Sequence, residues 1–313
     1  MLQAEHLVKQ YGDFTAVDDI SFNAGKGSVF GLLGPNGAGK STTISCISGL
    51  LAPTSGRVSV AGHDTIKDGK AARKSLGVVP QELALYDDLP AVENLRYWGK
   101  AYGMRGQQLE TRVKDVLDYI GLADRAKDLP KTFSGGMKRR LNFGCGIVHR
   151  PAVLLLDEPT VGVDPQSRAR LFDLVEAERD AGACILYTTH YMEEAERLCD
   201  SLAVIDHGKI IAQGTVAELK ATLGARDALQ LSGVFPADGI RQALERLRDR
   251  IADLEVISEE QHTVTLALSS ASNHLPDIFQ AITAAGGVVN ETSLRSPNLE
   301  TLFLLLTGKE LRE

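Results

Sequence analysis

The sequence predicts an α/β fold with a mixed β-sheet, followed by a small C-terminal α+β domain. Three observations indicate this fold class. A glycine-rich loop at residues 34–41 joins an apolar, β-prone run to a helical one, and a second apolar run ends in two carboxylates at residues 157–158. The other segments alternate between strand and helix periodicity, and 313 residues are enough for one large domain and a small one.

The first element is a strand, loop and helix around residue 40. Val29 to Leu33 are mostly apolar, and residues 34–41 then read G-P-N-G-A-G-K-S. Glycines let the backbone turn its N–H groups toward phosphates, and a helix opening at Ser41 directs its positive end at the anion. Lys40 can reach the β- and γ-phosphates of a nucleoside triphosphate, and the Ser41 hydroxyl can bind Mg²⁺. The expected nucleotide-binding residues are Gly34, Pro35, Asn36, Gly37, Ala38, Gly39, Lys40, Ser41 and Thr42.

The next segment, from Tyr86 to about His149, is predicted to be helical, whereas residues 1–84 alternate strands and turns. Its apolar residues recur at helix spacing until Gly121, which is a helix stop. These residues are Val113, Val116, Leu117 and Ile120. The segment therefore predicts a helical subdomain inserted after the phosphate loop.

Near the end of this segment, residues 133–137 read F-S-G-G-M and predict a second anion site. Ser134 is a favourable N-cap for a helix from Met137 to Gly146. The N–H groups of Gly135 and Gly136, together with the helix dipole, can bind a phosphate. One chain would then carry two anion sites in different parts of its fold.

Two carboxylates follow a strand that is predicted to be fully buried. Val153 to Leu156 are all apolar, which is typical of a parallel strand covered on both faces. Ligands bind at the carboxyl ends of such strands. We expect Asp157 to hold Mg²⁺ through water and Glu158 to polarise the attacking water as general base. Two solvated acids would be the simpler interpretation, but the upstream phosphate loop favours a catalytic one.

Residues 151–215 return to alternating strands and helices. Arg168 to Asp180 have helical spacing. Two short strands, Ala203–Asp206 and Lys209–Ala212, flank a turn at His207-Gly208. This part should complete the sheet.

The segment 221–313 predicts a separate α+β domain. Its strands and helices follow the order β-α-β-β-α-β plus a final helix, which is compatible with a ferredoxin-like unit. The apolar positions fall near 229–231, 240–251, 254–256, 264–268, 275–282, 288–289 and 299–306. It contains no cluster of catalytic residue types.

Taken in order, the motifs resemble the ATP-binding cassette (ABC) family over about residues 1–220. They are Y-G-D-F-T-A-V from Tyr11, V-V-P-Q-E with Gln81, F-S-G-G-M with Ser134, L-L-L-D-E with Glu158, V-G-V-D ending at Asp164, and Y-T-T-H-Y-M-E-E-A with His190. A lone Tyr, Gln, His or Gly pair means little, but their joint occurrence is specific. The resemblance implies a P-loop NTPase core with a mixed sheet, an antiparallel β part and a helical subdomain at about 86–149.

The resemblance also implies a role for each motif. Tyr11 would stack on adenine, and His190 would contact the γ-phosphate. Gln81 would sense Mg²⁺ and face the transport partner. Catalysis would involve Glu158, His190 and Gln81. The metal would be bound by Ser41, Gln81 and Asp157. A nucleotide held by another subunit would be contacted by Ser134, Gly135, Gly136 and Asp164.

This shared site predicts a homodimer. Two copies would close head to tail over two Mg·ATP, each nucleotide lying between the phosphate loop of one copy and the Ser134–Gly136 segment of the other. ATP binding would then drive closure, and hydrolysis would release it.

The run S-G-G-M-K-R-R and the ending N-L-E-T-L-F-L-L-L-T-G-K-E-L-R resemble one branch of the family, which serves exporters of drugs, polyketides, polysaccharides and lipids. Met137 stands where many members have Gln. The basic residues 138–140 either add positive potential near the nucleotide or form a solvated helix face. We expect the ATP-hydrolysing motor of an exporter; the alternative is a soluble ATPase of the family that serves no transporter.

Composition and spacing argue against other classes. The net charge of −7 and an aromatic content of 5% do not favour a nucleic-acid partner. No Asn precedes a Lys, as a GTPase base-reading motif would require. The interval from Lys40 to Ser134 leaves room only for the helical subdomain, not for the coiled coil or zinc module of DNA-repair relatives.

The same features predict where the chain works. Four scattered cysteines without a C-x-x-C pair suggest buried thiols in a reducing cytosol. No apolar run approaches the length of a membrane span, and no signal peptide is expected. We therefore expect a cytoplasmic protein, peripheral on the inner face of the cell membrane, that binds an integral membrane permease encoded as a separate polypeptide.

Overall fold

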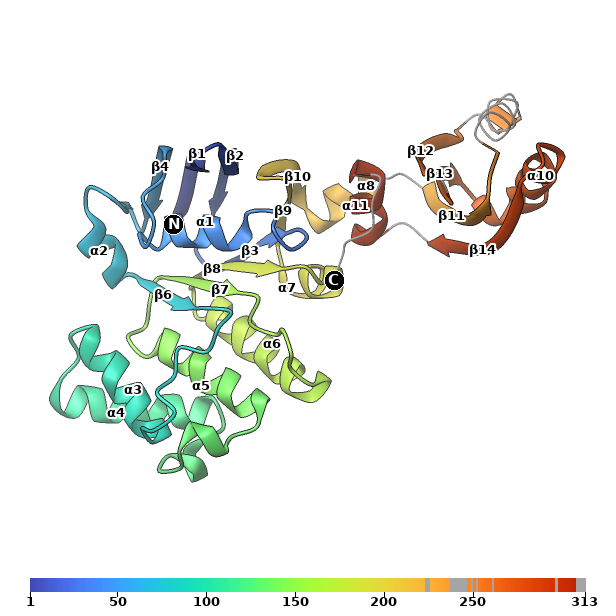
Figure 1. Cartoon of the computed structure of the whole chain (residues 1–313). Coiled ribbons are helices and arrows are strands. Elements are labelled where there is room, and N and C mark those ends of the chain that lie inside the picture. Colours follow the sequence, from blue (N-terminus) through green and yellow to red (C-terminus); the bar gives the residue numbers. More distant parts are fainter. Residues whose placement is uncertain are drawn as a thin grey trace. The chain divides into compact units, whose positions relative to one another are not determined.

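The computed structural model describes residues 1–222, 226–236, 247–248, 250–251, 253–260, 262–295 and 298–307. The chain forms two compact units, Met1–Gln213 and Gly214–Glu313 (Figure 1). Each unit has its own sheet and core and is described by itself. In the described part of the chain, no helix combines the length and the apolar character needed to cross a membrane.

A six-stranded sheet in the order β10-β9-β3-β8-β7-β6 organises the first unit. The strands are β3 Ser28–Leu33, β6 Leu76–Val79, β7 Val153–Asp157, β8 Cys184–Thr189, β9 Ser201–Asp206 and β10 Lys209–Thr215. Neighbouring strands from β9 to β6 run parallel. Every residue of β7 and β8 is buried, which explains their continuous apolar runs. Parallel pairing brings the carboxyl ends of β3, β8 and β7 to one edge.

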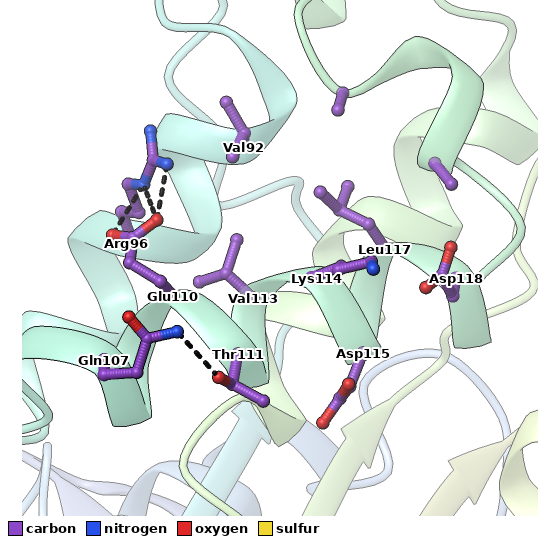
Figure 2. Close-up of a pocket in the computed structure, with 12 residues that line it drawn as sticks. Val92, Arg96, Gln107, Glu110, Thr111, Val113, Lys114, Asp115, Leu117 and Asp118 are labelled. Atoms are coloured by element: carbon purple, nitrogen blue, oxygen red, sulfur yellow. Dashed lines mark hydrogen bonds and ion pairs between the residues drawn. The ribbon is translucent and has the colours of Figure 1, made fainter.

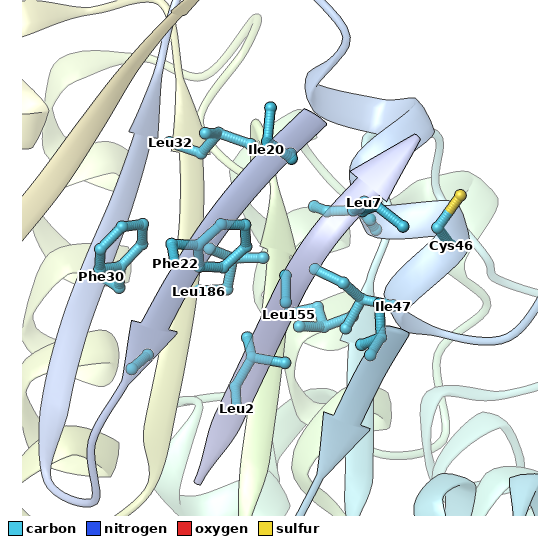
Figure 3. Packing of buried hydrophobic residues seen from close by; sticks show 14 of the residues in the cluster. Leu2, Leu7, Ile20, Phe22, Phe30, Leu32, Cys46, Ile47, Leu155 and Leu186 are labelled. Carbon is cyan, nitrogen blue, oxygen red and sulfur yellow. The ribbon is translucent and has the colours of Figure 1, made fainter. Parts of the chain in front are cut away.

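A second, antiparallel sheet packs with the first and with α1 (Lys40–Ile47). Its strands are β1 Leu2–Tyr11, β2 Phe14–Ala24, β4 Ser55–Val60 and β5 His63–Asp64, in the order β2-β1-β4-β5. One buried cluster joins the two sheets (Figure 3), and in it the Phe22 ring stacks on Phe30 with centroids 4.9 Å apart. The four cysteines are buried and unpaired, as the sequence predicts. This core fixes β3, and with it the start of the phosphate loop.

Helices cover the segment that the sequence assigns to a helical subdomain. They are α3 Ala91–Ala101, α4 Gly106–Tyr119 and α5 Gly135–Ile147, after a short α2 Gly69–Lys74. Two 3₁₀ turns, Ala123–Arg125 and Pro130–Thr132, lie between α4 and α5. The Ser134 hydroxyl accepts a hydrogen bond from the Met137 N–H at 3.3 Å, so the predicted N-cap is confirmed.

Two further helices follow β7 and β8, namely α6 Pro165–Asp180 and α7 Met192–Leu198. Helix α6 begins at Pro165, earlier than the predicted Arg168. The Asp164 carboxylate accepts the Ser167 N–H at 2.9 Å and caps the helix, and proline is well suited to the first helical position. The helix therefore starts at the end of the V-G-V-D motif.

The second unit contains an antiparallel sheet in the order β12-β13-β11-β14. Its elements are α8 Val216–Thr222, β11 Arg226–Val234, β12 Glu255–Glu260, β13 Thr263–Ser269, α10 Ala271–Ala284, β14 Val288–Arg295 and α11 Leu299–Thr307. Strand β13 lies between β11 and β12, which is the split βαβ arrangement of a ferredoxin-like unit. The predicted helix at 240–251 lies largely outside the described residues, although Leu247 and Ile251 are buried in the core of this unit.

His149 gives the first unit a pH-dependent stability. Its ring stacks on Tyr102 with centroids 3.5 Å apart, and Nε2 lies 3.1 Å from the Leu76 carbonyl oxygen. Burial lowers the pKa of His149 to about 4. Below pH 6.5 the unfolded chain therefore binds a proton that the folded chain excludes, so the free energy of unfolding falls as the pH decreases toward 4.

We expect His149 alone to contribute a decrease of up to about 1.4 kcal/mol per pH unit in this range. His149→Phe keeps a ring against Tyr102 but cannot titrate, so its stability should change less between pH 7 and pH 5. Urea unfolding followed by fluorescence of the single tryptophan, Trp98, would measure both proteins. Equal pH dependence in the two proteins would contradict the assignment.

Candidate functional site

The phosphate loop lies between β3 and α1 and is closely packed. Gly39 has a φ of +110°, and a Cβ at this position would lie 2.5 Å from the Ala16 carbonyl oxygen, so only glycine fits. Helix α1 begins directly after it at Lys40. The Lys40 Nζ donates to the carbonyls of Gly34 at 2.7 Å and Pro35 at 3.0 Å. The loop thus positions the lysine ammonium group at the carboxyl end of β3.

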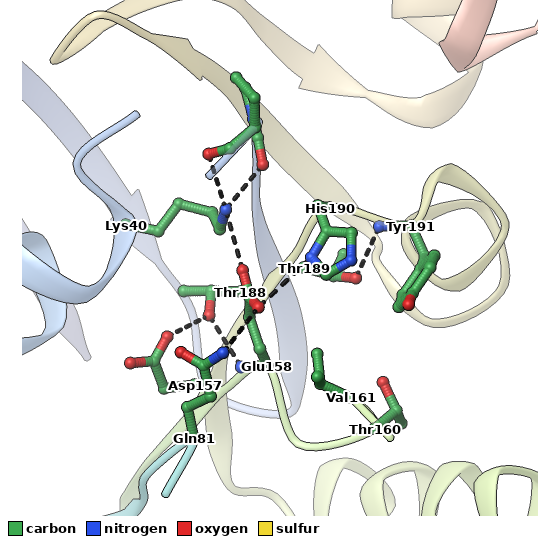
Figure 4. Close-up of polar contacts among 12 residues, drawn as sticks. Lys40, Gln81, Asp157, Glu158, Thr160, Val161, Thr188, Thr189, His190 and Tyr191 are labelled. Carbon is green, nitrogen blue, oxygen red and sulfur yellow. Dashed lines mark hydrogen bonds and ion pairs between the residues drawn. The ribbon is translucent and has the colours of Figure 1, made fainter. Parts of the chain in front are cut away.

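Three predicted site residues meet at the carboxylate of a fourth, Glu158 (Figure 4). Lys40 Nζ lies 2.9 Å from Glu158 Oε1, and both side chains are about 95% buried. Gln81 Nε2 donates to Glu158 Oε2 at 3.3 Å, and His190 Nδ1 lies 3.3 Å from the same oxygen. Glu158 is therefore the centre of the cluster, although these residues come from distant positions in the chain.

Glu158 is held as a carboxylate. Burial acts to raise its pKa, but the hydrogen bond and charge of Lys40, assisted by His190, outweigh burial and keep the pKa below its ordinary value. The group is therefore ionised at neutral pH. An ionised carboxylate can accept a proton, which is what a general base requires.

The backbone of Glu158 is strained in a way that fixes its side chain. Its φ is +43°, in the left-handed region that residues other than glycine rarely adopt. Its N–H lies 3.0 Å from the Thr188 hydroxyl oxygen and 3.2 Å from the Thr188 carbonyl oxygen on the neighbouring strand β8. Pairing between β7 and β8 thus holds the conformation that directs the carboxylate toward Lys40.

Asp157 lies beside this cluster in a separate contact. Its Oδ1 accepts the Thr188 hydroxyl at 2.7 Å, and the residue is 7% exposed. Asp157, the Gln81 amide and the Ser41 hydroxyl offer the oxygen ligands that Mg²⁺ prefers. Among the described residues, no group of three or more His, Cys, Asp or Glu side chains could hold a metal. The donor set suits Mg²⁺ bound by one carboxylate together with substrate phosphates, which is the usual arrangement for this ion.

Sequence analysis missed the contribution of Glu194, on α7. This carboxylate is 1% exposed and accepts three hydroxyl groups, from Thr160 at 2.7 Å, Thr189 at 2.8 Å and Tyr187 at 3.0 Å. The Thr189 hydroxyl also accepts the Tyr191 N–H at 2.9 Å. The network therefore fixes the turn that carries His190 and connects it to the segment after Glu158. The sequence does contain one sign that Glu194 is buried: it follows the helical spacing of Met192, Ala195 and Leu198, which are also buried.

The Ser134–Gly136 segment lies against the start of α6. A Cβ on Gly136 would lie 2.0 Å from the Ser167 hydroxyl oxygen, so only glycine permits this approach. Asp164 Oδ2 is 3.5 Å from the same point. The pKa of Asp164 is lowered by the hydrogen bond that it accepts from the Ser167 N–H. Within residues 1–222, no hydrogen bond or ion pair joins this segment to Lys40 or Glu158.

Tyr11 lies apart from the Glu158 cluster, at the end of β1. Its side chain is 46% exposed, and Lys9 Nζ lies 5.1 Å from the ring centroid. An exposed ring face is the property that adenine stacking requires.

The sequence leaves two interpretations open for the basic run after Met137, positive potential near the nucleotide or a solvated helix face. Lys138 pairs with Asp87 at 3.3 Å. Arg139 and Arg140 are half-buried and donate hydrogen bonds to backbone carbonyls. Arg139 donates to carbonyls of two loops, and Arg140 donates to carbonyls that follow the end of α4. The solvated-face interpretation is therefore wrong for the two arginines, which bind the protein's own backbone.

A cavity of about 680 Å³ lies between α3 and α4, away from these residues (Figure 2). Arg96 beside it forms ion pairs with Glu93 and Glu110 at 2.6 and 2.5 Å. None of the predicted site residues lines this cavity. Its position argues against a role in nucleotide chemistry.

A second hollow, which we call the α2–α3 groove, lies closer to Gln81. It consists of cavities of about 500 and 200 Å³ that share Val78, Trp98 and Tyr102. Pro80 and Ala84, on either side of Gln81 in the sequence, line the smaller cavity. The groove thus adjoins the loop that supplies Gln81.

Comparison with known proteins places these features in context. The family model for ABC transporters matches residues 17–161. The chain is 45% identical to the linearmycin resistance ATP-binding protein LnrL of Bacillus subtilis, with all of both chains covered. It is 39% identical to the daunorubicin/doxorubicin resistance ATP-binding protein DrrA of Streptomyces peucetius, covering 98% of this chain and 92% of that one. It is 38% identical to the Nod factor export ATP-binding protein I of Cupriavidus metallidurans, covering 100% and 99%.

Solved structures agree with this similarity. An ATP-binding subunit of an ABC transporter superposes with a TM-score of 0.66 at 32% identity, covering 72% of this chain and 93% of that chain. The ADP conformation of MJ1267, an ATP-binding cassette of an ABC transporter, gives a TM-score of 0.63 at 26% identity, with 70% and 92% covered.

Proposed function

Because this chain belongs to the ABC transporter family and has its ATPase fold, we propose that it is the motor subunit of an exporter. The observation that carries the proposal is the convergence of Lys40, Gln81 and His190 on Glu158. Full-length similarity to the ATP-binding proteins of linearmycin resistance, daunorubicin/doxorubicin resistance and Nod factor export supports a role in export, for which we propose drugs, lipids or polysaccharides as cargo. The alternative, a soluble ATPase without a transporter, is not favoured by these relatives.

In the proposed reaction, Lys40 binds the β- and γ-phosphates of ATP and Glu158 activates water. Bound Mg²⁺, held by Ser41, Asp157 and Gln81, would neutralise charge on the phosphates. Since Lys40 is paired with Glu158 at 2.9 Å, a γ-phosphate would compete with Glu158 for the ammonium group. Glu158 would then take a proton from the attacking water. At the same time the water oxygen would bond to the γ-phosphorus, and the bond between the γ-phosphorus and the ADP oxygen would break. His190 would contact the γ-phosphate.

The proposal includes a head-to-tail homodimer. Ser134 and Gly135 are exposed at the start of α5, and within residues 1–222 no hydrogen bond joins them to the Glu158 cluster of their own chain. A second copy could therefore place this helix start on the γ-phosphate, where N–H groups and the helix dipole favour an anion. Asp164, beside Gly136, would lie at the same interface. Tyr11 would stack on the adenine ring.

We further propose that the membrane permease binds in the α2–α3 groove. The chain would then lie in the cytoplasm, at the inner face of the membrane. Exposed apolar side chains occur in the same segment, namely Leu83, Tyr86, Leu89 and Tyr97. Tyr86 and Tyr97 lie next to the groove, because the Tyr97 ring contacts both Tyr86, at 4.7 Å between centroids, and the groove residue Trp98, at 5.5 Å. Trp98 Nε1 is buried and has no hydrogen-bond partner among the described residues. Exposed apolar area with aromatic anchors is typical of a surface that binds another protein.

Two asparagines would connect this surface to the active site. Asn94 accepts the Tyr86 N–H at 2.8 Å and donates to the Leu89 carbonyl at 2.9 Å. Asn142 accepts the Ala84 N–H at 3.1 Å and donates to the Pro80 carbonyl at 3.3 Å. The loop around Gln81 is thus fixed to the helices, so a displacement of the partner would move Gln81.

Co-purification with an integral membrane protein would test the proposal. We expect the full chain to capture its permease from detergent-solubilised membranes, and Tyr86→Ala to weaken capture about 30-fold or more, as loss of an aromatic anchor does. Leu294→Ala, with 42% exposure against 43% for Tyr86, is the matched control on β14. Capture of no membrane protein would support the soluble alternative, and equal capture by Tyr86→Ala would remove the groove from the proposal.

A further inference from the structure

Arg139 connects three functional segments through one side chain. It lies on α5, five positions after Ser134. Its Nη1 donates to the carbonyl of Gln81, and its Nη2 donates to the carbonyl of Val161 at 3.1 Å. Both acceptors belong to loops of the first unit that come from other parts of the sequence.

The two loops that Arg139 holds both adjoin Glu158. The Gln81 side chain donates to Glu158 Oε2 at 3.3 Å, and the Val161 N–H donates to the Glu158 carbonyl at 3.3 Å. The guanidinium group is therefore linked to Glu158, the proposed general base, through two intermediate residues, Gln81 and Val161. Burial lowers the pKa of Arg139, which agrees with a partly desolvated group, and charge-assisted hydrogen bonds are strong in such a setting.

We propose that Arg139 is a positioning residue that joins the phosphate-capping start of α5 to the hydrolysis site of the same chain. This inference rests on the proposed dimer, in which α5 moves when Ser134–Gly136 caps the partner's nucleotide. The guanidinium fork then moves Gln81 and the loop at Val161 with the helix. A chain would thus align its own Glu158 when it caps its partner's ATP.

The geometry requires arginine rather than lysine. The planar guanidinium presents two N–H groups in a fixed fork, whereas a lysine ammonium is a single point charge on a flexible stem. Arg139→Lys should therefore keep the charge but lose the simultaneous bond to both loops. Arg140 offers a matched control on the same helix, because it is also half-buried and donates to the carbonyls of Ile120 at 2.6 Å and Gly121 at 3.1 Å, both in the helical segment.

The first measurement compares ATP turnover in the full-length single variants. We expect Arg139→Lys to lower kcat about tenfold or more, with KM for ATP within about twofold of the wild-type value, because the loss concerns alignment of the water-activating group. Arg140→Lys should lower the melting temperature with kcat nearly unchanged. Equal loss of kcat in both variants would show that Arg139 only stabilises α5 and would overturn the proposal.

The second measurement locates the effect within a mixed dimer of one active chain and one Glu158→Gln chain. Arg139→Lys in the active chain should reduce turnover, whereas Arg139→Lys in the Glu158→Gln chain should not. A loss in the second arrangement would mean that Arg139 serves the capping segment, which acts on the partner's nucleotide, and would overturn the proposal. If Arg139→Lys does not fold, Arg139→Gln, which keeps a planar pair of N–H donors, must show the same asymmetry.

The same experiment separates this inference from the proposed function. A chain that hydrolyses ATP at full rate as a monomer would overturn the dimer and the inference together. Dimers that form with nucleotide but show no difference between the two arrangements would overturn the inference alone.

Discussion

Glu158→Gln is expected to reduce ATP turnover by about 10²- to 10⁴-fold, the usual contribution of a general base. Glutamine keeps the size of the side chain and can still contact Lys40 and Gln81, but it cannot accept the proton of the attacking water. Because the carboxylate that pairs with Lys40 at 2.9 Å is also removed, ATP binding should be equal or tighter. Phosphate release and nucleotide binding would measure the two effects separately.

The same variant should accumulate a nucleotide-bound dimer, because closure would no longer be released by hydrolysis. Size-exclusion chromatography with Mg·ATP would detect it. Glu193→Gln makes the same chemical change at an exposed position of α7 and should behave like the wild type. If Glu158→Gln still turned over ATP at the wild-type rate, another residue would have to position the water.

Lys40→Ala is expected to weaken ATP binding about 10- to 150-fold, which corresponds to losing hydrogen bonds from a charged group worth about 1.5–3 kcal/mol. The lysine is 4% exposed and held by the Gly34 and Pro35 carbonyls, so its ammonium group is already positioned for phosphate. Titration with a fluorescent ATP analogue would measure the change. Lys26→Ala, at an exposed turn, is the control.

Removal of Lys40 also leaves Glu158 buried without its cation, which can itself destabilise the fold. The double variant Lys40→Ala/Glu158→Gln removes both charges and should recover the melting temperature, because replacing both partners avoids an uncompensated buried charge. Its ATP affinity should stay low. Recovery of ATP binding in the double variant would show that Lys40 acts only by neutralising Glu158 and does not bind the phosphates.

The local parts of the fold could be predicted because their causes lie within a few residues. The apolar run at 153–156 indicated a buried parallel strand, and Ser134 indicated a helix start. Alternating apolar residues after 226 indicated the strands of the second unit in their correct order. Helix starts were less accurate, as the beginning of α6 at Pro165 illustrates, because a side-chain cap such as Asp164 sets the first residue of a helix and the apolar spacing does not.

Contacts between distant residues could not be predicted in the same way. Nothing near Arg139 in the sequence indicates that its guanidinium group reaches Gln81 and Val161, and nothing near Glu194 indicates that three hydroxyl groups surround it. These contacts depend on how β6, β7 and β8 lie beside one another and where α5 packs on them. Residue type therefore left open either a solvated basic face or added positive potential near the nucleotide, whereas the fold uses two half-buried arginines that bind backbone carbonyls.

The residues alone define the elements and the chemical groups available to them: the phosphate loop around Lys40, the acids at 157–158 and the family resemblance that follows from them. That Glu158 is the common partner of Lys40, Gln81 and His190 became visible only in the folded chain. Backbone preferences and hydrophobic periodicity act over one or two turns of chain and cannot place such distant residues together. The meeting of side chains from β3, β6, β7 and β8 depends instead on parallel strand register, which the whole core enforces.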